Sequence, residues 1–186
     1  RVDASSDVLG KRDSIREVLS AVRTEQGAKS PEKVWADYAR VTPEEAQQLS
    51  ESTGLNIDER YVHSLVGESV VHSRNKHGET AEKRNDQLPV TDADYEMIPE
   101  VIRSPDSITR GAEKTRRGLD TIVYTKRVNG HVLIVEEVRT KRGKLTFHTI
   151  RKSKPGYVYD TSLPGHTVTK EKDRSEGVTS ETSPNP

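Results

Sequence analysis

The sequence predicts an α+β fold in which N-terminal helices pack on a small antiparallel β-meander. Residues 121–128 and 131–138 are rich in β-branched and apolar residues, and Asn129 and Gly130 between them are the strongest short signal for a β-hairpin. Before residue 104, helix-start signals precede apolar residues at helical spacing. The 186 residues are 30% hydrophobic and 32% charged, which suits a core of about 100 residues with polar ends.

Three helices are predicted in the first 54 residues. Apolar side chains at positions 8, 15, 18, 19 and 22 predict a weak amphipathic helix within residues 1–30. Ser30 as a cap and Pro31 as the first helical residue predict a second helix that runs through Tyr38. Thr42, Pro43 and the two glutamates that follow predict a third helix, which Gly54 ends.

The next segment alternates between extended and helical character. Residues 61–64 are predicted to be extended, and residues 68–77 to form a short helix that Gly78 closes. Residues 79–88 are polar and are predicted to form a loop. Thr91 starts a further helical stretch that continues to the turn at Ser104-Pro105-Asp106.

The hairpin fixes which side chains share a face of the meander. A two-residue turn puts Tyr124 and Lys126 on one face, and residues 144–151 supply the third strand after a turn at Gly143. Residues 132–135 are apolar on both faces, so their strand should be central and covered by helices. If Arg139 lies opposite Leu145, then Thr149 and Arg151 join Lys126 and Tyr124 on one surface. A one-residue slip would replace Thr149 with His148, and the sequence leaves both registers open.

The sequence divides into a helical extension or linker (1–41), a main domain (42–154) and a polar tail (155–186) that is expected to be disordered. The sequence begins with Arg1, and we expect the chain to be a fragment or a processed piece of a longer protein. No stretch is long and apolar enough for a membrane span, so no membrane partner is predicted. The absence of cysteine excludes disulfides, thiolate zinc sites and cysteine nucleophiles.

Positive charge is concentrated in one part of the chain. Residues 110–154 carry 13 Lys and Arg against four Asp and Glu, although the whole chain has a net charge of zero. Such a block is typical of a surface that binds a polyanion, above all a nucleic acid. The alternative is a solvated sheet edge on which lysines prevent aggregation.

Four histidines are candidates for chemistry: His63, His72, His77 and His148. His72 and His77 are five residues apart, about 140° around a helix, so they do not share a face as metal ligands would. We therefore predict neither a metal nor another cofactor. Histidine can give and take protons near neutral pH, and nearby Lys or Arg can stabilise a charged phosphorane. The alternative for any single histidine is a helix cap or a place in the core.

Several motifs, in order, resemble the phage-associated Barnase–EndoU–colicin–RelE-like nuclease family. The resemblance spans most of residues 53–152. The motifs that carry it are Thr53-Gly54-Leu55-Asn56-Ile57, Tyr61-Val62-His63-Ser64, Val71-His72-Ser73-Arg74-Asn75-Lys76-His77-Gly78, Leu88-Pro89-Val90-Thr91 with Asp94, Ile98-Pro99-Glu100, Ser104-Pro105-Asp106, Tyr124-Thr125-Lys126, Val135-Glu136-Glu137-Val138-Arg139 and Thr149-Ile150-Arg151-Lys152.

The resemblance implies a ribonuclease domain over residues 42–154 with its active site on the sheet face beside the helical histidines. His72 and His77 match the histidine helix of the family, Lys126 its strand lysine, Thr149 its late hydroxyl position and His63 an earlier histidine. Our hypothesis makes His72 and His77 the acid/base pair and Lys126 the phosphate stabiliser, with Thr149 and Arg151 orienting the phosphate.

The remaining predicted substrate contacts are His63, Tyr124, Arg139 and Lys152. The expected product is a 2′,3′-cyclic phosphate, and the expected partners are RNA, with tRNA as one candidate, and an acidic inhibitor protein. The resemblance also implies a virion-associated protein or a secreted effector that acts in a bacterial cytoplasm. The main alternative is a non-catalytic module of a phage structural or internal protein that binds nucleic acid or a neighbouring subunit.

Overall fold

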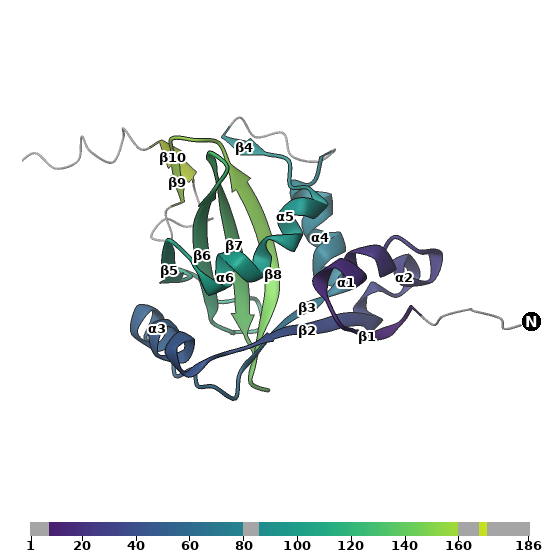
Figure 1. The fold of residues 1–186 in the computed structure, drawn as a ribbon, viewed down its shortest axis with the longest axis horizontal. Coiled ribbons are helices and arrows are strands. Elements are labelled where there is room, and N and C mark those ends of the chain that lie inside the picture. The colour runs from purple at the N-terminus through teal and green to yellow at the C-terminus, as the bar shows by residue number, and fades with distance from the viewer. Residues whose placement is uncertain (1–7, 80–85, 160–167, 171–186) are drawn as a thin grey trace, which may run out of the picture.

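The computed structural model, shown in Figure 1, describes residues 8–79, 86–159 and 168–170. Its helices are α1 (Ile15–Ala21), α2 (Glu25–Lys29), α3 (Pro43–Thr53), α4 (Gly67–His77), α5 (Asp92–Glu96) and α6 (Ile98–Arg103), with a 3-10 turn at Pro31–Lys33. Its strands are β1 (Gly10–Arg12), β2 (Val34–Arg40), β3 (Val62–Val66), β4 (Gln87–Leu88), β5 (Ser107–Arg110), β6 (Thr121–Val128), β7 (His131–Arg139), β8 (Lys144–Ser153), β9 (Tyr157–Tyr159) and β10 (Val168–Lys170). The α+β class is confirmed.

The predicted meander is the centre of a larger sheet. Eight strands belong to it, in the order β1-β2-β3-β8-β7-β6-β5, with β4 pairing beside β8. Strands β6, β7 and β8 are antiparallel neighbours, and Val128 pairs with His131 as the hairpin signal predicts. The sheet exceeds the predicted size because β3 adds to β8 in parallel and brings β2 and β1 with it.

The prediction of a helix through residues 30–38 is wrong. Pro31 opens only one 3-10 turn, and the chain then becomes strand β2 between β1 and β3. Val34 and Ala36 are buried while Trp35 and Asp37 are not, which is the two-residue period of a strand. Tertiary pairing therefore overrides the helix-start signal at Ser30 and Pro31.

The predicted helix within residues 1–30 is divided into two. Ser14 caps α1 and Thr24 caps α2, and Val8 lies before both helices. Residues 1–7 lie outside the described part of the chain. The segment 8–41, which the sequence suggests to be an extension or linker, supplies two strands of the main sheet and buries Ile15, Val18 and Leu19 in the main core.

The other predicted helices are confirmed. Thr42 and Glu45 form the capping box of α3, and Gly54 ends it in the left-handed conformation with φ of 70°. Helix α4 ends before Gly78, and a second capping box between Thr91 and Asp94 starts α5. None of the described helices has the length and apolarity that a membrane span needs.

Two further expectations fall partly outside the described residues. In the predicted loop 79–88, Gln87 and Leu88 pair with β8, and residues 80–85 are not described. In the predicted disordered tail, β9 and β10 pair with each other in an antiparallel ladder. For residues 160–167 and 171–186 the expectation of disorder lies outside the described part of the chain.

The two faces of the sheet have different roles. One face packs against the helices, of which α5 and α6 lie in front of the sheet in Figure 1. Every buried apolar side chain of a described helix belongs to this main core, whereas Val123, Ile134 and Val132 form a separate cluster of strand residues alone. We call the side of this small cluster the helix-free face. It also carries Trp35, Asp37, Thr125, Arg127, Glu136, Lys144, Thr146, Thr149 and Arg151.

A β-bulge in β8 sends Thr149 and Arg151 to the helix-free face. Arg139 pairs with Leu145 as predicted, but the register then shifts, and Glu136 pairs with Thr149. The expectation that Thr149 and Arg151 share a surface with Lys126 and Tyr124 is therefore wrong, and so is the alternative with His148 in place of Thr149. Lys152, rather than Arg151, pairs with Leu133 on the covered face.

The N-terminal segment gives a first prediction. A chain that begins at residue 42 should lose cooperative unfolding or several kcal/mol of stability, because it lacks five fully buried or nearly buried apolar side chains worth about 1.5–3 kcal/mol each. They are Ile15, Val18, Leu19, Val22 and Val34. Urea unfolding of the truncated and full chains measures the loss. An unchanged cooperative transition would show that residues 8–41 are an appended extension.

Candidate functional site

His63, predicted to contact substrate, lies in the centre of a buried ion cluster on the covered face. Its Nδ1 is 2.9 Å from Oε2 of Glu137 on β7, and its Nε2 is 2.6 Å from Oε1 of Glu45 in the first turn of α3. The side chain is fully buried. Burial alone would lower the pKa of His63, but the charges and hydrogen bonds of Glu137 and Glu45 raise the pKa to about 10. The imidazole is therefore a cation that donates from both nitrogens.

Two tyrosines complete this cluster. Tyr38 on β2 stacks on the His63 ring, with 5.9 Å between ring centroids, and donates its hydroxyl to Glu137 at 3.3 Å. Tyr124 is fully buried, and its burial and the charge of Glu137 raise its pKa well above the usual value. The structure thus brings together two predicted substrate contacts, His63 and Tyr124, inside the core.

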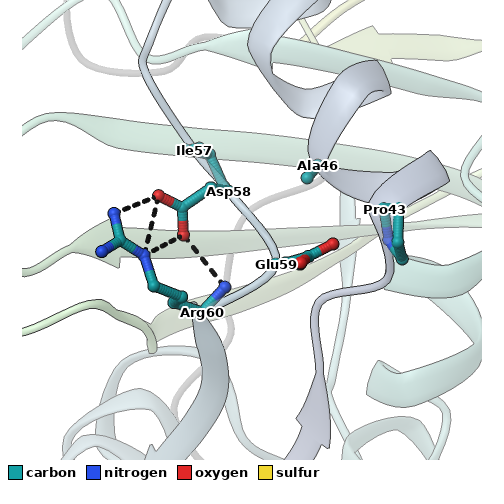
Figure 2. Close-up of a pocket in the computed structure, with 6 residues that line it drawn as sticks. All are labelled: Pro43, Ala46, Ile57, Asp58, Glu59 and Arg60. Atoms are coloured by element: carbon teal, nitrogen blue, oxygen red, sulfur yellow. Dashed lines mark hydrogen bonds and ion pairs between the residues drawn. The ribbon is translucent and has the colours of Figure 1, made fainter.

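Arg139, another predicted substrate contact, donates hydrogen bonds to the loop between α3 and β3. Its Nε donates to the Tyr61 hydroxyl at 3.0 Å, and its guanidinium also donates to the carbonyl of Asn56 at 3.0 Å. The same loop lines a surface pocket of about 340 Å³, shown in Figure 2. On its wall Asp58 and Arg60 form an ion pair at 2.7 Å, and with Glu59 the lining has more acid than base. Such a lining does not suit a polyanion.

The predicted catalytic histidines do not approach one another. Both lie on α4, where His72 is exposed and His77 is buried at 5% exposure. Lys126 donates to the carbonyl of Ser104 at the end of α6, at 2.6 Å. Thr149 lies on the other side of the sheet. The structure therefore does not bring His72, His77, Lys126 and Thr149 together, and their catalytic roles stay predictions.

Lys152 belongs to a small polar group at the end of the covered face. Its Nζ donates to Asp94 Oδ2 at 3.2 Å. The same oxygen accepts the backbone N–H of Thr91 in the capping box. His131 is close by: partial burial and the charge of Lys152 lower its pKa. Lys152 therefore links β8 to the start of α5.

Three groups suited to phosphoryl transfer lie on the helix-free face, and a fourth, His148, lies in the bulge beside them. Glu136 on β7 pairs directly with Thr149 on β8, and the next pair on that face joins Ile134 to Arg151. Glu136 is buried at 4% exposure, Thr149 and Arg151 are partly exposed, and His148 is exposed at the bulge. A carboxylate, an imidazole, a hydroxyl and a guanidinium thus lie within adjacent rungs of two strands. The sequence predicts Thr149 and Arg151 as site residues but gives no such prediction for Glu136.

A signal for this arrangement is present in the sequence. Leu145, Phe147 and Ile150 are all buried in the main core, yet a regular strand would turn Ile150 away from Phe147. The change of spacing from two to three residues indicates a bulge.

Among the described residues, no group of three or more His, Cys, Asp or Glu is arranged to hold a metal ion.

Comparison with known proteins gives one family. The family described as phage-Barnase-EndoU-ColicinE5/D-RelE like nuclease3 matches residues 39–159. The match begins within β2, ends with β9 and includes Glu136, His148, Thr149 and Arg151. No curated protein and no solved structure matches the chain.

The ion cluster gives a second prediction. His63→Ala removes the cation that pairs with buried Glu137 and should cost about 3–5 kcal/mol of unfolding free energy. Because its folded pKa of about 10 exceeds the ordinary 6.5, the contribution of His63 is complete below pH 6.5 and falls as pH rises towards 10. Urea unfolding of the wild type and His63→Gln between pH 7 and 10 should show a steeper decline for the wild type.

The matched control is His72→Ala, since His72 is an exposed histidine and its loss should change stability by no more than about 0.5 kcal/mol. A cost below about 1 kcal/mol for His63→Ala, or parallel pH dependences, would contradict a charged and stabilising His63.

Proposed function

Because the chain belongs to the phage-Barnase-EndoU-ColicinE5/D-RelE like nuclease3 family, we propose that it is a metal-independent RNA endonuclease whose active site lies on the helix-free face. The observation that supports this most is the pairing of Glu136 with Thr149, with His148 in the adjacent bulge and Arg151 on the next rung. The basic block of residues 110–154 supplies most of this face and favours a polyanionic substrate.

The reaction needs only these side chains. Glu136 takes the proton of a ribose 2′-hydroxyl, and the 2′-oxygen attacks the adjacent phosphorus. His148 gives a proton to the departing 5′-oxygen, so that the bond between phosphorus and this oxygen breaks. The products are a 2′,3′-cyclic phosphate end and a 5′-hydroxyl end. The role of the 2′-hydroxyl as nucleophile makes RNA, and not DNA, the substrate.

Arg151 and Thr149 act on the phosphate in this proposal. The guanidinium of Arg151 can bind two phosphate oxygens and stabilise the charge that grows in the transition state. Thr149, directly opposite Glu136, can donate a hydrogen bond to a phosphate oxygen and so orient the phosphate relative to the general base Glu136. A preorganised donor of this kind contributes roughly 10²–10³ in rate. An acidic inhibitor protein would be a suitable partner for the same basic face.

The proposal gives a third prediction. Purified chain incubated with total RNA or tRNA in excess chelator should produce cyclic phosphate ends. His148→Ala and Glu136→Gln should each reduce the cleavage rate roughly 10²–10⁴-fold, because each removes a proton-transfer group. His148 is exposed at the bulge, so its replacement should leave urea unfolding unchanged.

His72→Ala is the control, because it removes another exposed histidine of the same chain, and its rate should stay within about threefold of the wild type. Loss of cleavage in His72→Ala with full activity in His148→Ala would support the helical histidine pair instead. A folded wild-type chain that cleaves none of these RNAs would favour the non-catalytic binding module.

A further inference from the structure

The helix-free face extends beyond the proposed active site to the edge of the sheet that β1 forms. On β2, Asp37 pairs with Ser64 of β3, and Ser64 pairs with Thr146 of β8. Trp35 lies two residues from Asp37 and pairs with Val66, so its side chain is on the same face. The edge strand β1 places Lys11 beside Trp35. Polar and aromatic side chains therefore continue along this face from Thr149 to Lys11.

Trp35 is surrounded by positive charge. Lys144 Nζ lies 4.4 Å and Lys11 Nζ 5.5 Å from the centroid of a Trp35 ring. Both ammonium groups also pair with Asp37, at 3.1 Å and 3.8 Å. Two cations share one carboxylate, which leaves the group with a net positive charge. The Lys11 side chain is 58% exposed and that of Lys144 36%, so both can contact a ligand.

We propose that Trp35, Lys11 and Lys144 form a subsite that binds one base and its phosphate in a single-stranded RNA. This subsite rests on the proposed function, because it implies that RNA reaches the active site as a single strand. An aromatic ring beside lysines is the combination with which proteins bind single strands: the ring stacks on a base, and the ammonium groups contact phosphates. In a duplex the bases would be unavailable for stacking on Trp35.

The subsite lies at a useful distance from the reacting phosphate. Lys144 and Thr149 are five residues apart on β8, about 16 Å along the strand. That distance corresponds to a few nucleotides of extended single strand. Lys11 and Trp35 precede residue 39, so these two members lie outside the part of the chain that matches the nuclease family.

Trp35 is the only tryptophan of the chain, so intrinsic fluorescence reports directly on this subsite. The probe is a single-stranded 2′-deoxy oligonucleotide of about ten nucleotides, which lacks the attacking hydroxyl and is not cleaved. We expect saturable quenching of Trp35 fluorescence as the oligonucleotide is added to the full chain. A duplex of the same sequence should quench much less.

Variants test each member of the subsite by anisotropy of a labelled oligonucleotide. Trp35→Ala should weaken binding about 5- to 100-fold, whereas Trp35→Phe should keep most of it, because phenylalanine can still stack. Lys11→Ala should reduce the salt slope of log K by about 0.7, the effect of one phosphate contact in a single strand. Lys33→Ala, an exposed lysine of the turn before β2, is the matched control and should leave the slope unchanged.

The outcomes separate this inference from the proposed function. Quenching by the oligonucleotide in a chain that cleaves no RNA would support the subsite and contradict the nuclease proposal. Cleavage of RNA without quenching, or with unchanged KM and kcat in both Trp35→Ala and Lys11→Ala, would overturn the subsite. Equal quenching by polyglutamate would overturn it too, in favour of an acidic protein ligand.

Discussion

Strand β8 buries Leu145, Phe147 and Ile150 against the helices, and it can do so only by inserting one extra residue between Phe147 and Ile150. The insertion places His148 at a bulge and turns Thr149 and Arg151 to the opposite face. Without it, the hydroxyl and the guanidinium would lie under the helices. Core packing thereby determines which side chains of β8 lie on the helix-free face.

The two faces of the sheet carry different polar groups. On the covered face, the fully buried, ionised His63 joins α3, β3 and β7 through Glu45 and Glu137. A buried cation between two carboxylates fixes the position of elements that are distant in sequence. On the helix-free face, Glu136 lies on β7 and Arg151 lies on β8. The core behind these two strands can hold both side chains in place.

Features governed by local physical chemistry can be predicted from the sequence. The hairpin register at Asn129 and Gly130, the capping box at Thr42 and the end of α4 at Gly78 all depend on neighbouring residues. Strand β2 and the bulge could not be found in this way, since both depend on partners far along the chain. His63 was selected as a histidine of interest, but its role follows from Glu137, which is 74 residues away.

We propose that RNA binds the helix-free face and not the histidine helix. Chemical-shift mapping by NMR, with a non-cleavable 2′-deoxy oligonucleotide added to labelled protein, tests it most directly. We expect the largest shifts at Glu136, Thr149 and Arg151 and their neighbours, with little change on α4. Shifts concentrated around His72 on α4, with β7 and β8 unchanged, would contradict it.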